Sequence, residues 1–363
     1  MDEMSGGWRN RVSKLMDLIQ ENELSAVLIR SEANIFYFTG YKGPGYLLIP
    51  LNGEPRLYVY PLDFELAKMY VRGGVKVEEL NMTARIENIV EDLPNEVKSR
   101  LGFDVMSAED YLKISELLGR ESLKPASEII WKLRMIKDQS EIRSIEKACD
   151  IASKAMDLAS EMLEDGVMES EVKAEILEEM LKLGADGAAF DIIVASGSRS
   201  SMPHGAPGNR VMKEGDVVVV DLGAIFEGYC SDMTRTFYVG RDPPEEVVKI
   251  YETVLEAKKL AEDATKPWTL SSALYDKVYD RFATRGYADY FIHGLGHGVG
   301  IEIHEPPRIS KTGKEMIQEN MVITIEPGIY LPGRFGVRIE DTLLVEKDGV
   351  RILTSAPYTL TPY

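Results

Sequence analysis

Residues 217–239, VVVVDLGAIFEGYCSDMTRTFYV, form the segment that decides the fold of this 363-residue chain. The four valines at its start are typical of a buried β-strand, and the run ends on Asp221. A two-residue turn at Glu227-Gly228 would return the chain as a second, antiparallel strand. The segment therefore predicts a β-hairpin of strongly apolar strands that carries acidic side chains.

The pairing register of this hairpin places two carboxylates on one face. With the two-residue turn, the numbers of paired residues sum to 455, so Asp221 faces Thr234. Asp232 is two residues from Thr234 and lies on the same face, diagonal to Asp221. At such a diagonal the two Cβ atoms are roughly 7 Å apart, within mutual reach through a shared ion. A one-residue bulge would break this parity.

A second hairpin of the same construction lies in residues 321–346, MVITIEPGIYLPGRFGVRIEDTLLVE. A turn centred on Gly333 places Glu326 opposite Glu340, because their numbers sum to 666, twice 333. A single acidic residue in a strand usually lies on the solvent face. Two pairs at pairing positions within apolar strands instead favour a shared site.

The charge of these four acids indicates a metal site. Four ionised carboxylates on half-buried strands repel one another, and buried charges persist when they are paired or bind metal. The local basic residues, Arg235 and Arg338, supply at most two positive charges. Two divalent cations would balance all four carboxylates.

Residues 293–305, HGLGHGVGIEIHE, hold three of the chain's four histidines, and glycine occupies every second position from 294 to 300. Because each glycine inside a helix costs about 1 kcal/mol relative to alanine, the stretch predicts an extended strand. Its glycine face would let another backbone or a ligand approach closely. His293 and His297 would stand roughly 13 Å apart, too far to share one ion. His304 has the other parity, so the stretch indicates a site whose imidazoles have separate roles.

The composition excludes several classes of protein. The formal net charge is −18, and so acidic a surface repels nucleic acid and anionic membranes. The sequence has no apolar run of the roughly 18 residues that a membrane span needs, and its N-terminus lacks the apolar core of a secretory signal. Two distant cysteines, Cys149 and Cys230, favour a reducing compartment. We therefore expect a cytoplasmic protein without nucleic-acid or membrane partners.

The sequence predicts two domains of α/β (α+β) class. The first, 1–125, is expected to be a small α/β unit with a hairpin closed by Asn52-Gly53. The second, 126–363, mixes long helices with β-hairpins. Its helices are expected over 139–164, opened by an Asp138/Glu141 capping box, and over 169–183, 244–264 and 269–285.

Four segments together resemble the catalytic domain of Xaa-Pro peptidases, the prolidase and aminopeptidase P group: VVVVDLGAIFEGYCSDMTRTF, HGLGHGVGIEIHEPPRIS, VITIEPGIY and GVRIEDTLLV. The resemblance covers about 130–363 in order and spacing, and 1–125 is similar to the group's smaller N-terminal domain. It implies a pita-bread catalytic fold, in which two related α/β halves enclose a dinuclear metal site. It also implies a homodimer.

The resemblance implies a complete set of metal ligands. These are Asp221, Asp232, His297, Glu326 and Glu340. Asp232 and Glu340 would contact both ions, and His297 only one. This mainly oxygen donor set suits Mn²⁺ or Co²⁺ and leaves Zn²⁺ and Fe²⁺ open. A pair of such ions can generate a hydroxide nucleophile near neutral pH.

Further residues around the ligands acquire roles by the same resemblance. His204, His293 and His304 would lie around the metals or contact substrate, and His204 or His304 would stabilise the oxyanion. Glu326 would also carry a proton to the leaving nitrogen. Arg338 would brace the carboxylates. Arg308 would anchor a substrate carboxylate.

The expected activity is hydrolysis of the peptide bond before proline, which has no N–H and a locked ring. Because Arg308 could hold a free carboxylate, a dipeptidase is favoured over an aminopeptidase acting on longer peptides. Methionine aminopeptidase resembles the same domain but lacks so large an N-terminal domain, and creatinase works without metal. A non-catalytic binding protein on this fold is a further alternative, although such relatives typically lose ligands.

Overall fold

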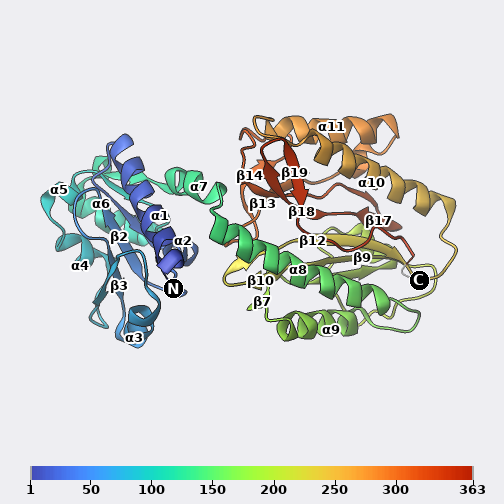
Figure 1. Cartoon of the computed structure of the whole chain (residues 1–363), viewed down its shortest axis with the longest axis horizontal. Helices are drawn as coiled ribbons and strands as arrows, with labels where there is room; N and C mark the ends of the chain where they lie inside the picture. The colour runs from blue at the N-terminus through green and yellow to red at the C-terminus, as the bar shows by residue number, and fades with distance from the viewer. Residues whose placement is uncertain (1, 362–363) are drawn as a thin grey trace. The chain divides into compact units, whose positions relative to one another are not determined.

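The computed structural model describes residues 2–361, and the chain divides between Arg134 and Met135 into two compact units (Figure 1). This division lies near the end of helix α7 (Ser127–Met135), whereas the predicted domain boundary at 125/126 lies just before that helix. Helix α7 belongs with the first unit, since Arg134 Nη1 donates a hydrogen bond to Asn34 Oδ1 at 2.7 Å. No helix among the described residues is long and apolar enough to cross a bilayer.

The first unit is built on one six-stranded sheet of order β4-β3-β2-β1-β5-β6. Its strands are β1 (Ala26–Ile29), β2 (Tyr46–Pro50), β3 (Arg56–Val59), β4 (Lys76–Glu79), β5 (Leu101–Phe103) and β6 (Leu123–Pro125). The other helices are α1 (Asp2–Glu21), α2 (Glu32–Thr39), α3 (Pro61–Tyr70), α4 (Ile86–Glu91), α5 (Asn95–Lys98) and α6 (Ala108–Leu118). Strands β2 and β3 form the predicted hairpin, with Gly53 in its turn at φ +123°.

The second unit has two halves, in each of which a pair of helices covers β-hairpins. Helices α8 (Gln139–Glu161) and α9 (Glu169–Lys182) precede β7 (Gly187–Ala188), β8 (Ile193–Ser196), β9 (Val217–Leu222), β10 (Ala224–Phe226), β11 (Tyr229–Cys230) and β12 (Met233–Tyr238). Helix α8 contacts β9 to β12 in this half (Figure 1). Its apolar stripe, including Ile145 and Ala152, is fully buried.

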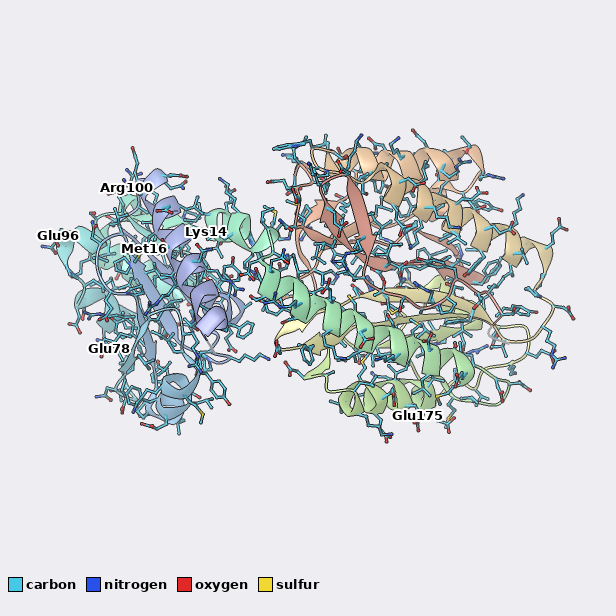
Figure 2. All side chains as sticks on the ribbon, in the orientation of Figure 1. Lys14, Met16, Glu78, Glu96, Arg100 and Glu175 are labelled. Carbon is cyan, nitrogen blue, oxygen red and sulfur yellow. The ribbon has the colours of Figure 1, made fainter. Side chains whose placement is uncertain are left out.

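In the other half, α10 (Glu245–Ala264) and α11 (Ser271–Thr284) lie over the C-terminal strands (Figure 1). These strands are β13 (Gly296–Gly298), β14 (Glu305–Ile309), β15 (Val322–Ile325), β16 (Gly328–Leu331), β17 (Phe335–Arg338), β18 (Asp341–Glu346) and β19 (Gly349–Ile352). Charged side chains such as Glu175 on α9 point outward from the unit (Figure 2). Acidic groups inside the unit therefore need a specific explanation.

Both predicted pairing registers are confirmed. In the first hairpin Asp221 pairs with Thr234 across β9 and β12, and the same sum of 455 continues through Ile225 and Cys230 to the turn. In the second, Gly328 pairs with Arg338. The numbers of paired residues in strands β15 and β18 also sum to 666. No bulge interrupts either hairpin within these described pairs, because Gly228 and Gly333 adopt left-handed φ values that suit tight turns.

The predicted strand through the glycine-rich stretch is shorter than expected, but its glycine face is confirmed. Within the described residues 293–304 only Gly296–Gly298 forms a strand, and the register with β14 shifts after His297. A Cβ built on Gly296 would lie 2.0 Å from the Thr324 carbonyl oxygen, and one on Gly298 would lie 2.2 Å from that of Pro306. Backbones from two neighbouring strands thus occupy the space that side chains would need.

This close approach predicts that Gly296→Ala is strongly destabilising. Since the blocking atom is backbone and cannot swing aside, we expect a loss of about 3 kcal/mol in the free energy of unfolding, the upper end for overpacking. Urea denaturation measures this loss. Gly349→Ala is the matched control, because no described atom lies within 4 Å of its Cβ position. Equal effects of the two substitutions would contradict the steric explanation.

Candidate metal centre

The predicted ligands lie where the two halves of the second unit meet. Asp221 is near the end of β9, and Asp232 immediately precedes β12. Glu340 immediately precedes β18, and an isolated bridge pairs it with Thr234, so that Glu340 N donates to Thr234 O at 3.0 Å. Thr234 also pairs with Asp221. One threonine thus joins the acidic positions of both hairpins.

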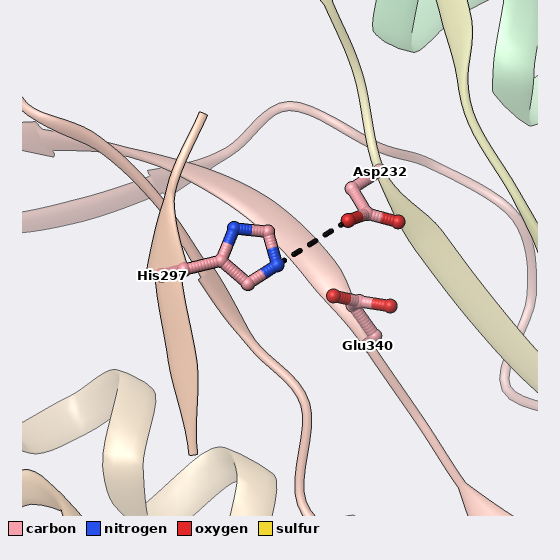
Figure 3. Close-up of side chains that lie close together, drawn as sticks. All are labelled: Asp232, His297 and Glu340. Carbon is pink, nitrogen blue, oxygen red and sulfur yellow. Dashed lines mark ion pairs between the residues drawn. The ribbon is translucent and has the colours of Figure 1, made fainter. Parts of the chain in front are cut away.

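Three of the predicted ligands form a compact cluster. One ligand atom each of Asp232, His297 and Glu340 lies within 4.8 Å of the other two (Figure 3). His297 Nε2 is 3.5 Å from Asp232 Oδ2. All three residues are at most 9% exposed. The two carboxylates and the imidazole come from three separate strand regions and converge on one point.

Glu326 and Asp221 adjoin this cluster in different ways. Glu326 Oε1 is 3.6 Å from His297 Nε2, and its Oε2 is 3.9 Å from His293 Nδ1, so Glu326 lies between the two histidines. Asp221 Oδ2 accepts a hydrogen bond from Arg338 Nη2 at 2.5 Å. The structure thus places Asp221 beside the cluster, oriented by an arginine.

The electrostatics of the site disfavour several charged carboxylates at once. Burial, followed by repulsion from Glu340, Asp221 and Glu326, raises the pKa of Asp232 well above its usual value. Burial, and then Glu326 and Asp221, likewise raise the pKa of Glu340. Burial raises the pKa of Glu326 to about 8. Burial and mutual repulsion therefore make it unfavourable for all of these carboxylates to be ionised together.

Two buried carboxylate oxygens add a test of whether cations fit the site. Glu340 Oε2 accepts a hydrogen bond from Thr234 Oγ1 at 2.7 Å, but Glu340 Oε1 has no hydrogen-bond partner among the described residues. The same holds for Asp221 Oδ1. Buried polar atoms nearly always have a partner, and such orphaned anionic oxygens suit a cation. The donor set therefore fits divalent metal ions.

Arg235 and Arg338, the two basic residues near the acidic pairs in sequence, have different partners. Arg235 lies 2.8 Å from Asp341, which also bonds Lys258, so its charge is balanced outside the cluster. Arg338 faces the cluster through Asp221, and its Nη1 donates to Tyr330 Oη at 2.8 Å. One arginine cannot balance four carboxylates. The excess of negative charge at the cluster is therefore larger than the sequence indicates.

His297 presents a neutral nitrogen to the cluster. Its Nδ1 is 3.0 Å from the Gly298 carbonyl oxygen, which fixes the proton on Nδ1 and leaves the Nε2 lone pair facing Asp232. Burial lowers the pKa of His297 to about 4. A neutral imidazole held by a backbone carbonyl is the form that ligates metals.

His293 is also neutral but is held by a tyrosine. Its Nδ1 donates to the Gly294 carbonyl at 2.7 Å, and its Nε2 accepts from Tyr330 Oη at 2.9 Å. Burial, followed by the charge of Arg338, lowers the pKa of His293 to about 4. Tyr330 was missed by the sequence reasoning, since a tyrosine in an apolar strand carries no distinguishing signal. Thr234 could have been found, because the predicted register places it opposite Asp221.

The remaining predicted residues, His304, Arg308 and His204, are all exposed. The His304 ring lies 4.4 Å from the His297 ring, centroid to centroid. Burial lowers the pKa of His304, and the charges of Arg308 and His204 act in the same direction. Arg308 is exposed and pairs directly with His297 across β13 and β14. His204 is exposed in the segment between β8 and β9.

Comparisons with known proteins agree with this geometry. Residues 143–347 match the metallopeptidase family M24, and residues 11–136 match the creatinase/prolidase N-terminal domain. The Xaa-Pro dipeptidase of Pyrococcus furiosus is 41% identical over 349 residues, 95% of this chain and 98% of that protein.

Solved structures extend the likeness to three dimensions. A prolidase from Pyrococcus horikoshii OT3 superposes with a TM-score of 0.90 at 39% identity, covering 97% of this chain and 99% of that one. An X-Pro aminopeptidase from Thermotoga maritima MSB8 gives a TM-score of 0.88 at 34% identity, covering 96% and 99%. The two-halved unit thus has the pita-bread fold that the resemblance implies, and a second domain of creatinase/prolidase N-terminal type precedes it.

Proposed function

The chain belongs to metallopeptidase family M24, and from this premise we propose that it is an Xaa-Pro dipeptidase, which hydrolyses the peptide bond before proline. The observation that carries the proposal is the buried Asp232–His297–Glu340 cluster with its orphaned carboxylate oxygen. The likeness to a Pyrococcus furiosus Xaa-Pro dipeptidase supports the choice of substrate.

We propose that the chain binds two divalent metal ions. Their ligands would be Asp221, Asp232, His297, Glu326 and Glu340. Four carboxylates and one imidazole form a mainly hard donor set, which supports Mn²⁺ or Co²⁺ over Zn²⁺ or Fe²⁺. When bound, such ions polarise a carbonyl and lower the pKa of water.

The chain's own residues would then direct the reaction. Glu326, which lies between His293 and His297, would pass a proton to the leaving proline nitrogen. His304 or His204 would donate a hydrogen bond to the carbonyl oxygen as it becomes negative. Arg338 would keep Asp221 oriented through their 2.5 Å hydrogen bond.

Assays on purified protein test this function. With Mn²⁺ or Co²⁺ added, we expect cleavage of Ala-Pro and none of Ala-Ala. Cleavage of Ala-Pro-Ala but not of Ala-Pro would instead favour an Xaa-Pro aminopeptidase. One structural relative, from Thermotoga maritima, is named as an X-Pro aminopeptidase. Tight metal binding without cleavage of either peptide would favour a binding protein.

Arg308 supplies a sharper test of dipeptide recognition. Because it is exposed and pairs with His297 in the ladder, it could reach a carboxylate placed just after proline. We expect Arg308→Ala to lower kcat/KM for Ala-Pro about 10–100-fold, the effect of losing a charged hydrogen bond, and to affect Ala-Pro-Ala far less. The exposed Lys311→Ala serves as control. Equal losses on both peptides would remove the anchor assignment.

Two further expectations remain proposals. We propose a homodimer, in line with the resemblance, and light scattering at micromolar concentration would reveal its mass. A monomer would contradict this proposal. The cytoplasmic location expected from the sequence stays a prediction, which fractionation of the native cells would check.

A further inference from the structure

The segment between β8 and β9 that carries His204, residues 197–208, is joined to the site from one side. Arg338 Nη1 donates to the Pro203 carbonyl oxygen at 3.3 Å, and Gly336 N donates to Ser200 Oγ at 3.0 Å. Both partners lie in β17, whose Arg338 also holds Asp221. The segment, here called the His204 loop, thus contacts the strand whose Arg338 orients the proposed metal ligand Asp221.

A single buried carboxylate joins the two ends of this loop from the other side. Glu169, the first residue of α9, is 0% exposed. Its Oε1 accepts hydrogen bonds from Ser196 N at 2.8 Å and Ser196 Oγ at 2.7 Å, where the loop begins. Its Oε2 accepts one from Gly208 N at 3.0 Å, where the loop ends. Arg199 Nε, within the loop, lies 3.3 Å from the same oxygen.

Backbone hydrogen bonds reinforce this anchor. Glu169 N donates to Arg210 O at 3.0 Å, and Ser170 N donates to Gly208 O at 3.2 Å. The carboxylate also lies at the N-terminus of a 14-residue helix, where the helix dipole stabilises negative charge. Glu169 therefore couples α9, a rigid element of the core, to both ends of a segment that also contacts β17.

The cost of burying this charge indicates a specific role. An isolated buried carboxylate is strongly unfavourable, and replacing a buried ionic network with apolar residues is often neutral or stabilising. Stability alone thus gives little reason for a charge here. What the network does provide is a fixed path for the loop, since its four donors lie at both ends of the loop and at Arg199 within it.

We propose that Glu169 is a positioning residue that fixes the His204 loop between α9 and β17, so that His204 remains at the site during hydrolysis. This rests on the proposed function for the role of His204. Glu169 itself contacts neither substrate nor metal in this scheme. It acts through the loop.

A double-mutant cycle separates positioning from a general structural role. Glu169→Gln keeps the shape of the side chain but removes its charge and turns one acceptor into a donor. We expect kcat for Ala-Pro to fall about 10–100-fold, as for partners that orient active groups, with KM and metal affinity little changed. In a His204→Ala background the same substitution should have almost no further effect. Additive losses would overturn the proposal.

Glu171→Gln is the matched control. Glu171 lies in the same first turn of α9, is exposed, and accepts a hydrogen bond from Met168 N rather than from the loop. Should Glu169→Gln fail to fold, Arg199→Ala tests the same contact from the loop side. Its effect should likewise vanish in the His204→Ala background.

Hydrogen exchange tests the anchor without any substrate. Amides of residues 197–208 should exchange faster in Glu169→Gln than in the parent or in Glu171→Gln, with no change in β9 or β12. Unchanged exchange in the loop would overturn the proposal. If the parent protein cleaves no Xaa-Pro peptide, the proposed function fails, and the exchange result alone then decides whether Glu169 anchors the loop.

Discussion

Glu340→Gln is expected to remove the bound metal and to lower Ala-Pro hydrolysis by about 10³-fold or more, equivalent to about 4 kcal/mol of transition-state stabilisation. Glu340 is 2% exposed, and its Oε1 has no partner among the described residues, so it is available to a cation. Glutamine keeps an oxygen to accept from Thr234 Oγ1, which preserves the local packing. Metal content by mass spectrometry and steady-state kinetics measure the two losses.

In the metal-free protein, by contrast, the same substitution should leave thermal stability unchanged or raise it. Burial and the charges of Glu326 and Asp221 raise the pKa of Glu340, which means that ionising it in the folded state is unfavourable. A neutral amide removes that repulsion, so in chelator the variant should unfold at the same temperature as the parent or higher. Glu141→Gln, a buried carboxylate in the α8 capping box, should leave metal binding intact. A variant that keeps two metal ions per chain would exclude Glu340 as a ligand.

Metal removal is expected to lower the thermal midpoint by about 10 °C at pH 8. Binding at 1,000 times the dissociation constant stabilises by about 4 kcal/mol, and each kcal/mol shifts the midpoint of a domain of this size by about 2–4 °C. Calorimetry with Mn²⁺ and with chelator measures the difference. A metal-independent midpoint would contradict the proposed centre.

The pH dependence of the metal-free protein follows from the same acids. The pKa of Glu326 is raised from 4.5 to about 8, so the folded state keeps a proton that the unfolded state has lost. The contribution of Glu326 to the free energy of unfolding is therefore fully present below pH 4.5 and is lost as the pH rises through 8. The pKa values of His293 and His297 are lowered from 6.5 to about 4, so these two histidines make stability rise with pH, but only below pH 6.5. Between pH 6.5 and 8 stability should therefore fall as pH rises. A rise over this window would contradict the assignment.

Local patterns predicted the parts of the fold that depend on neighbours in sequence. The alternation of strand side chains and a two-residue turn determine the Asp221–Thr234 pairing, which the structure confirms. The capping box of α8 is also confirmed, with Glu141 N donating to Asp138 Oδ1 at 3.1 Å and Asp138 N donating to Glu141 Oε2 at 2.9 Å. Alternating glycines indicated close backbone approach, which Gly296 shows. These features follow from chain geometry over a few residues.

Contacts between distant segments could not be predicted in the same way. The Thr234–Glu340 bridge joins residues 106 positions apart, and its existence depends on how the two halves pack. Glu169 lies 27 residues from its partner Ser196, and nothing in the sequence of its helix distinguishes it from the other glutamates there. The assignment of all five residues as metal ligands stays a prediction. Asp232, His297 and Glu340 lie close together, and Asp221 and Glu326 adjoin them.

The bridge between Thr234 and Glu340 has a consequence for the chain during its synthesis. Asp221 and Asp232 emerge from the ribosome with the first half of the second unit, whereas His297, Glu326 and Glu340 emerge with the second. Neither half alone contains a full set of the proposed ligands. A nascent or partly folded chain would therefore be inert toward cellular peptides, and hydrolytic capacity would begin only when the two halves have docked.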